Sequence, residues 1–463
     1  MLFSSLIFLY VFFPLCLLLY FLCRNLKAKN GVLLIASLLF YAWGEPVYLL
    51  LMVAVAGANW AFGRLLGKQP ERKFLALAVI FNLLCLGVFK YTGFLLENVY
   101  ALAHIERAAP QIALPIGISF YTFQAMSYVI DVYRGQVGVQ RSFAKFLLYV
   151  SLFPQLIAGP IVRYSDIAVQ LKTREHSVSE AASGARRFIL GLAKKILLAN
   201  LLGELVSSFR ASADLSVLYY WLGAIAFTLQ IYYDFSGYSD MAIGLGRIFG
   251  FRFPENFQYP YLSGSITEFW RRWHISLGSW FRDYLYIPLG GNRKGSARQL
   301  LNILLVWLAT GLWHGAAWNF VLWGLLYAVL LTAEKLFLLR GLQKLHVLNH
   351  VYVLLFVTLG FVLFDASSVQ DAAQSIRAMF GGGGLPMVSA ESLYELRSCT
   401  VLLLLAVAGA TPLAKSLCAA VQRSRAGKTA LAVLEPVGLI ALLAVCTAFL
   451  VDGSFNPFLY FRF

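Results

Sequence analysis

Long runs of apolar residues, separated by short polar loops, recur along the whole chain. A run of about 20 residues reaches across the roughly 30 Å hydrocarbon core of a bilayer. A β-barrel would instead show weaker alternating segments of about ten residues. The chain is therefore predicted to be an all-α polytopic membrane protein. Its spans are predicted at residues 2–23, 31–43, 46–63, 74–98, 114–132, 188–209, 217–247, 299–313, 317–338, 350–366, 398–414 and 431–451.

Two regions break this pattern. Residues 143–160 close with the run FPQLIAGP, which is too broken for a simple span, and they are predicted to be re-entrant. Residues 250–298 mix arginine with Trp and Tyr, the composition of an interfacial or re-entrant segment. A polar loop is predicted at 163–187, and the outward-facing loop 367–397 is a candidate docking surface. The whole chain, 1–463, is predicted to be a single transmembrane domain.

Composition and charge support a membrane protein. Of 463 residues, 60% are hydrophobic and 13% charged, whereas soluble proteins carry charge on about a quarter of their residues. The formal net charge of +16 comes from basic residues concentrated in short loops, which is the positive-inside distribution rather than a nucleic-acid surface. With the basic side taken as cytoplasmic, both termini are predicted to be extracytoplasmic. No basic segment precedes the first apolar run, so it does not resemble a cleaved signal peptide.

Several common chemistries have no motif in the chain. The six cysteines lie in or beside apolar segments without the spacing of a metal site or a disulfide framework. A Walker A loop, a dinucleotide-binding G-x-G-x-x-G after a strand and a G-x-S-x-G nucleophile motif are also missing. We therefore predict no resident metal and no bound nucleotide cofactor.

One histidine lies inside an apolar run. His314 belongs to the stretch TGLWHGAAWNFVLWG, and the nearest charged residues in sequence are Arg298 and Glu334. Ionisable side chains are costly inside a membrane and usually mark function, although a histidine satisfied by a neighbouring helix is the alternative. A neutral imidazole accepts a proton near pH 7, so His314 is a candidate general base.

Two further polar clusters stand out. His274 follows Arg271 and Arg272, whose forked donors suit phosphate, but arginines that anchor an interfacial segment would give the same pattern. Asp234 and Asp240 in QIYYDFSGYSD do not share a helix face, so hydrogen bonding between helices is favoured over a paired-carboxylate mechanism.

These motifs together resemble the membrane-bound O-acyltransferase family. FWRRWHISLGSWFRDYLYIPLGG at 269–291 and GLWHGAAWN at 311–319 carry the resemblance. It extends to FYAW at 40–43, LPIGISFYTFQ at 114–124, QLIAGPIVR at 155–163 and YDFSGYSD at 233–240, and so covers essentially the whole chain. The most similar branch is the bacterial one that transfers acetyl groups to polysaccharides such as alginate and peptidoglycan.

The resemblance implies a helical bundle in which two funnels meet at a narrow tunnel. His314 matches the family's catalytic histidine, and His274 matches its second polar position. Acetyl-coenzyme A would be the cytoplasmic acetyl donor, and a separate extracytoplasmic, SGNH-hydrolase-like or esterase-like protein would be the partner. Coenzyme A phosphates would be held at the tunnel mouth by basic residues among Arg271, Arg272, Arg282, Arg293 and Lys294.

The chain's last residues also resemble a motif of this branch. In FNPFLYFRF at 455–463, Tyr460 matches a tyrosine proposed to carry the acyl group. A phenol has a pKa of about 10, closer to that of a thiol than an aliphatic hydroxyl has, so an aryl ester keeps much of the thioester's transfer potential. An aromatic anchor at the membrane interface is the alternative reading of Tyr460, and the tail 452–463 is predicted to lie outside.

The sequence therefore predicts an O-acetyltransferase of the bacterial inner membrane that exports acetyl groups and leaves coenzyme A inside, where its charges stay hydrated. A D-alanyl transferase for teichoic acid is the nearest alternative. A transporter or flippase would show inverted repeats and pore-lining charges, which the chain lacks, and a structural scaffold would leave His314 unexplained. The sequence does not identify the polysaccharide.

Overall fold

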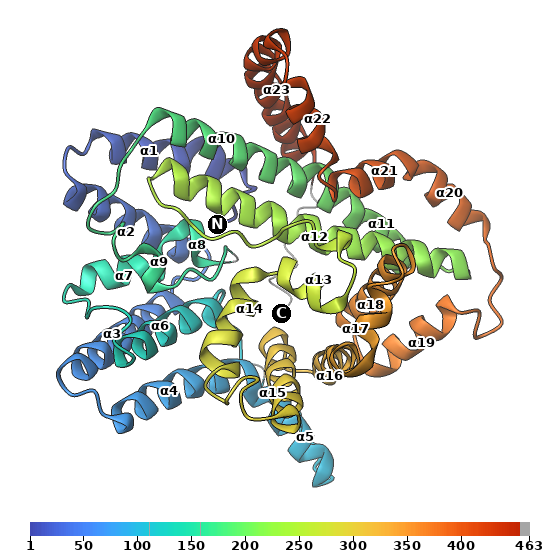
Figure 1. The fold of residues 1–463 in the computed structure, drawn as a ribbon, viewed down its shortest axis with the longest axis horizontal. Helices are drawn as coiled ribbons and strands as arrows, with labels where there is room; N and C mark the ends of the chain where they lie inside the picture. Colours follow the sequence, from blue (N-terminus) through green and yellow to red (C-terminus); the bar gives the residue numbers. More distant parts are fainter. Residues whose placement is uncertain (111, 158, 454–463) are drawn as a thin grey trace. The chain divides into compact units, whose positions relative to one another are not determined.

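The computed structural model describes residues 1–110, 112–157 and 159–453, which form helices joined by loops (Figure 1). The chain divides into two compact units. Unit 1 contains Met1–Phe188 and Tyr238–Glu255, and unit 2 contains Ile189–Gly237 and Asn256–Phe463. The all-α class predicted from the sequence is confirmed.

Unit 1 holds the N-terminal helices and the ends of two helices that it shares with unit 2. Its own elements are η1 (Phe8–Phe12), α1 (Phe13–Leu22), α2 (Leu26–Ala42), α3 (Tyr48–Lys68), α4 (Arg72–Leu86), η2 (Gly87–Tyr91), α5 (Thr92–Leu102), α6 (Ile118–Tyr133), α7 (Phe143–Ser151), α8 (Phe153–Leu156) and α9 (Tyr164–Ile167). The shared helices are α10 (Val178–Ala193) and α12 (Val217–Ile248).

Unit 2 holds the remaining helices, several of them short. They are η3 (Lys194–Asn200), α11 (Leu201–Ala211), η4 (Pro260–Leu262), α13 (Ile266–Arg272), α14 (Ile275–Phe281), η5 (Arg282–Tyr286), α15 (Ser296–His314), α16 (Trp318–Ala333), η6 (Glu334–Leu338), α17 (Leu339–Leu342), α18 (Leu348–Asp365), α19 (Val369–Met379), α20 (Ala390–Ser398), α21 (Thr400–Gly409), α22 (Leu413–Val421) and α23 (Arg425–Asp452).

Length and hydropathy identify membrane spans among these helices. Within the described residues, five segments are long and apolar enough to cross a bilayer: Tyr48–Lys68, Arg72–Leu102, Trp318–Leu342, Leu348–Asp365 and Arg425–Asp452. The bent pair α20 and α21, with an angle of 55°, makes a sixth if it is one span. The chain is a multi-pass membrane protein.

The predicted interruptions appear where the sequence is broken. α7 and α8 are separated at Leu152, just before Pro154, and the region 250–298 contains only the short elements η4, α13, α14, η5 and the start of α15. α15 ends at His314 and α16 begins at Trp318, which matches the predicted break in GLWHGAAWN.

The polar loop predicted at 163–187 is partly wrong, because α9 and the first turns of α10 lie inside it. In α10 the buried positions Gly184, Phe188 and Leu192 recur every four residues, while Arg186 faces outward. The polar composition of this stretch therefore reflects one exposed helix face. The helical spacing of its apolar residues, rather than its overall polarity, is the correct basis for predicting its secondary structure.

Side-chain caps begin several helices where the sequence supplies them. The Asn25 carboxamide accepts a hydrogen bond from the Ala28 backbone N–H at 2.8 Å at the start of α2. The Ser265 hydroxyl accepts one from the Glu268 N–H at 3.0 Å at the start of α13. Such caps satisfy backbone donors that have no partner within the helix.

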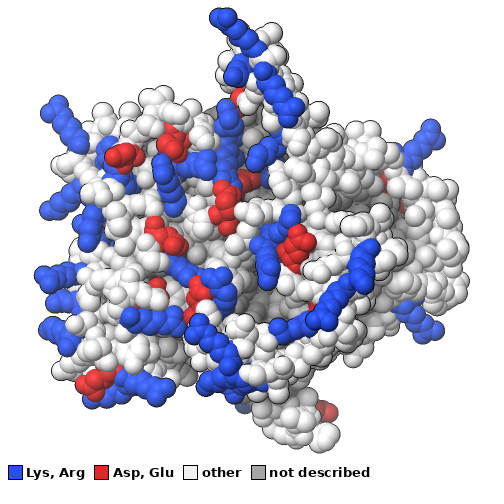
Figure 2. All heavy atoms as spheres, viewed as in Figure 1, with Lys and Arg blue, Asp and Glu red and all other residues white. Residues whose placement is uncertain are grey.

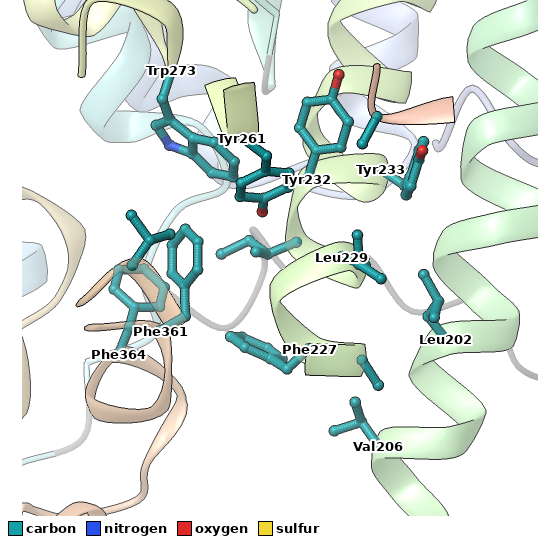
Figure 3. Packing of buried hydrophobic residues seen from close by; sticks show 14 of the residues in the cluster. Leu202, Val206, Phe227, Leu229, Tyr232, Tyr233, Tyr261, Trp273, Phe361 and Phe364 are labelled. Carbon is teal, nitrogen blue, oxygen red and sulfur yellow. The ribbon is translucent and has the colours of Figure 1, made fainter. Parts of the chain in front are cut away.

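An aromatic-rich core occupies unit 2. Figure 3 shows Tyr232 of α12, Tyr261 of η4 and Trp273 after α13 close together, with Phe361 of α18 beside them. The ring centroids of Tyr232 and Tyr261 are 5.3 Å apart, and those of Trp273 and Phe361 are also 5.3 Å apart. This core packs short helices against long ones and so fixes the segment that precedes His274.

Candidate active site

Close packing of α15 against α16 fixes the position of His314. At Gly311 a Cβ would collide with the carbonyl oxygen of Phe320, and at Gly324 with that of Trp307. Because both positions lack side chains, the two backbones touch, as is common for small residues at membrane helix interfaces. His314 follows Gly311 by three residues and is the last residue of α15.

Aromatic rings surround His314, a residue that is 9% exposed. The centroid of the imidazole lies 4.9 Å from Trp313, 5.1 Å from Trp323 and 5.2 Å from Phe364. Phe364 belongs to the C-terminal end of α18, so three helices converge on this histidine. These rings lower the polarity around His314, which strengthens electrostatic interactions with a bound substrate.

His274 lies between α13 and α14 in a left-handed backbone conformation, with φ of +45°. Non-glycine residues adopt this conformation rarely, and it is frequent at functional sites. The ring is 3% exposed and contacts Phe235 at 4.6 Å and Trp313 at 5.9 Å between centroids. Trp313 therefore contacts both histidines.

Both histidines line one cavity of about 560 Å³. Its aromatic walls include Trp270 and Trp307, and Thr267 and Thr310 add hydroxyl groups. Burial, together with the nearby His314, lowers the pKa of His274 well below its usual range. Both effects favour the neutral form of the His274 imidazole.

The basic residues proposed for phosphate binding separate into two groups. Arg271 and Arg282 line the cavity. Arg272 forms an ion pair with Glu268 at 2.6 Å, and Arg293 and Lys294 lie in the exposed segment before α15, outside the described cavity lining. Basic side chains are prominent on the face on which α13 and α14 are seen (Figures 1 and 2).

Sequence reasoning missed a buried carboxylate that supports this wall. Glu334, 1% exposed at the start of η6, accepts hydrogen bonds from the Ile266 N–H at 2.6 Å, the Thr267 N–H at 2.8 Å and the Thr267 hydroxyl at 2.6 Å. It therefore binds the first turn of α13, the helix that leads into His274. Its position 20 residues after His314 in sequence gave no indication of this contact.

The aspartates of QIYYDFSGYSD have separate partners. Asp234 forms an ion pair with Lys195 of η3 at 2.6 Å, with both side chains buried. Asp240, in unit 1, pairs with Arg187 at 2.8 Å. The predicted role in contacts between helices is confirmed, in the form of ion pairs.

A second cavity in unit 2, of about 320 Å³, lies among α11, α12, α18 and α19. Asp365 and Arg210 line it and form an ion pair. Asp365 follows Phe364, whose ring contacts His314. One end of α18 thus contributes to both the histidine surroundings and the second cavity. Tyr460, the remaining predicted site residue, lies outside the described residues.

Two buried histidines therefore line one cavity among the short helices α13 and α14 and the longer α15 of a multi-pass membrane protein. Residues 136–364 match the family described as MBOAT, membrane-bound O-acyltransferase family. The chain belongs to this family, and it is an O-acyltransferase.

Three related proteins differ in how much of this chain they match. The chain is 40% identical over its full length to a probable alginate O-acetylase of Azotobacter vinelandii, of which it covers 100%. It is 34% identical to a peptidoglycan O-acetyltransferase of Helicobacter pylori, over 84% of this chain and 81% of that protein. A teichoic acid D-alanyltransferase of Bacillus subtilis is 28% identical over 48% of this chain and 59% of its own length.

Proposed function

We propose that this protein transfers acetyl groups from cytoplasmic acetyl-coenzyme A across the bacterial inner membrane to an extracytoplasmic acceptor. An SGNH-hydrolase-like or esterase-like partner then acetylates a cell-envelope or exported polysaccharide. Relatives that align with most of the chain are named for O-acetylation, whereas the D-alanyltransferase aligns with 48% of it, which favours acetyl over D-alanyl.

The observation that carries this proposal is the position of His314. Its ring lines the cavity that Arg271 and Arg282 also line, and it contacts Phe364 beside the second cavity. A thioester entering past the arginines and a hydroxyl entering from the second cavity would meet at this ring. The arginines offer charge-assisted hydrogen bonds to coenzyme A phosphates.

The chemical step uses His314 as a general base. The acceptor oxygen attacks the thioester carbonyl carbon while its proton passes to the imidazole. The new C–O bond forms, the C–S bond breaks, and the proton moves from His314 to the leaving sulfur. The products are an acetyl ester and coenzyme A thiol, so the histidine returns to its neutral form.

Tyr460 is the proposed first acceptor of the acetyl group. In this proposal both termini of the chain lie on the extracytoplasmic side of the membrane. The test is mass spectrometry of the purified protein after incubation with acetyl-coenzyme A. We expect acetyl on the C-terminal peptide of the wild type, and no acetyl in His314→Ala or Tyr460→Phe. His346→Ala, a change at an exposed histidine, serves as the matched control and should retain the adduct.

Two other results would change the proposal, one for the role of Tyr460 and the other for the role of His314. Coenzyme A release that needs the partner and His314 but leaves no adduct would mean direct transfer to the partner, with Tyr460 an anchor. Undiminished coenzyme A release by His314→Ala would contradict the role of this histidine.

A further inference from the structure

One carboxamide determines which nitrogen of His274 carries a proton. The Asn256 side-chain oxygen lies 3.2 Å from the Ser276 backbone N, 2.9 Å from the Ser276 hydroxyl and 3.1 Å from His274 Nδ1. A backbone N–H can only donate, so the Asn256 atom at the centre of these contacts must be the oxygen. That oxygen can only accept, and His274 Nδ1 must therefore carry the hydrogen.

The other ring nitrogen is left as an acceptor. In neutral imidazole only one nitrogen bears hydrogen, so His274 Nε2 presents a lone pair. This atom is buried and has no hydrogen-bond partner within the described part of the chain. Buried acceptors are nearly always satisfied, and His274 is one of the residues lining the cavity that a substrate would fill. A bound molecule that brings an N–H or O–H group would complete the site.

We propose that Asn256 is a positioning residue that keeps His274 as a hydrogen-bond acceptor for an amide N–H of the donor's pantetheine arm. This inference rests on the proposed function, since it assigns a contact to the acyl donor. A thioester carbonyl offers only acceptor atoms, so it cannot satisfy Nε2. In this tautomer His274 binds and aligns the donor and does not polarise the carbonyl through Nε2.

The surroundings of the two histidines suit separate roles, in which His274 binds the donor and His314 acts as the base. Trp313 contacts both rings, with centroids 5.9 Å from His274 and 4.9 Å from His314. In pantetheine the amide nitrogen is joined to the sulfur through two methylene groups. An amide held at His274 therefore brings the adjacent thioester towards the neighbouring His314.

The test uses two truncated donors that differ in one group. S-acetyl-N-acetylcysteamine contains the amide N–H, and S-acetyl-2-mercaptoethyl acetate has an ester oxygen in its place. We expect the wild type to favour the amide donor by about tenfold in kcat/KM, the effect of one buried acceptor losing its donor. In His274→Leu this ratio should fall to about one, because the acceptor is gone.

Conservative variants separate positioning from general damage. His274→Gln restores an acceptor oxygen and should keep a preference for the amide donor. Asn256→Asp still accepts from Ser276 and from His274 Nδ1, so it should retain the ratio, whereas Asn256→Leu should lose it. The His346→Ala control should behave as the wild type.

Equal use of both donors by the wild type would overturn this inference while the proposed function stood. An unchanged preference in His274→Leu would overturn it as well. Failure of the wild type to consume acetyl-coenzyme A itself would overturn the proposed function, and this inference with it.

Discussion

His176 in unit 1 and His274 in unit 2 have opposite hydrogen-bonding arrangements. The Tyr20 hydroxyl donates to the Phe249 carbonyl at 2.9 Å, and its oxygen lies 2.7 Å from His176 Nε2 and 3.0 Å from Arg174 Nη2. His176 Nε2 therefore donates within a network made entirely of protein groups. The buried Nε2 of His274 accepts, and no described protein group donates to it.

The comparison sets a histidine with protein partners beside one that we propose binds a ligand. His176 joins the loop before α10 to α1 and to the end of α12, all within unit 1, and the side chain is exposed. His274 is buried and lines a cavity, and the Asn256 oxygen lies 3.1 Å from its Nδ1. Burial at a cavity and an unsatisfied ring nitrogen therefore distinguish His274 from His176, although both are histidines.

The largest expected effect is on the chemistry at His314. We predict that His314→Ala lowers the rate of coenzyme A release in the presence of the partner by about 10²–10⁴-fold, the usual contribution of a general base. His176→Ala should change this rate by about twofold at most. Thiol detection of released coenzyme A measures both. A comparable loss in the two variants would remove the distinction between the histidines.

The next effect concerns the wall that carries His274. Glu334→Leu leaves two backbone N–H groups and a hydroxyl at the start of α13 without their acceptor, and we expect a loss of about 2–4 kcal/mol in the free energy of unfolding. Glu334→Gln, which keeps one acceptor oxygen, should lose less. Denaturant titration in detergent measures the difference, and equal stability of wild type and Glu334→Leu would contradict this account.

A satisfied polar pair in unit 1 should behave differently. Asn59 and Asn82 exchange side-chain hydrogen bonds of 3.0 and 2.8 Å between α3 and α4. Asn59→Leu should cost about 1 kcal/mol in unfolding free energy, and adding Asn82→Leu should cost less than the sum of the single changes. Transfer activity should change by about twofold at most, because the pair is structural. A double variant that loses activity but not stability would assign this pair a functional role.

The smallest expected effect is the contribution of His176 to the pH dependence of stability. Although His176 is exposed, the loss of part of its hydration, followed by the charges of Lys29 and Arg174, lowers its pKa below the ordinary 6.5. The unfolded chain therefore binds a proton more readily, and the stabilisation present above pH 6.5 is lost as the pH falls through the lowered pKa. His176→Gln should flatten this acid-side decline in unfolding midpoint. An unchanged pH profile would exclude His176 as its source.

Much of the fold could be predicted from the sequence because membrane helices satisfy their own backbone hydrogen bonds. The break between α15 and α16 followed from Gly315 and its neighbours, and α12 was predicted to within one residue at its end. The first turns of α10 were missed because the exposed Arg186 and the half-buried Glu180 gave the stretch a polar composition. An exposed helix face carries such residues at no cost.

Within the candidate site, the sequence singled out His314 because ionisable groups are expensive in apolar surroundings. It singled out His274 by its position beside Arg271 and Arg272 and by the family resemblance. It also supplied Arg271 and Arg282 by composition. It could not separate these arginines from Arg293 and Lys294, because distance from the cavity depends on how the short helices pack. Tertiary structure decided that separation.

The sequence by itself determined a multi-pass helical protein, its family and the two histidines. Only the tertiary structure decided that the Asn256 side chain contacts His274 Nδ1 and that Glu334 binds the start of α13. These partners lie 18 and 68 residues apart along the chain. Periodicity and hydropathy describe each segment alone, whereas a hydrogen bond between distant segments exists only once packing has removed water from both groups.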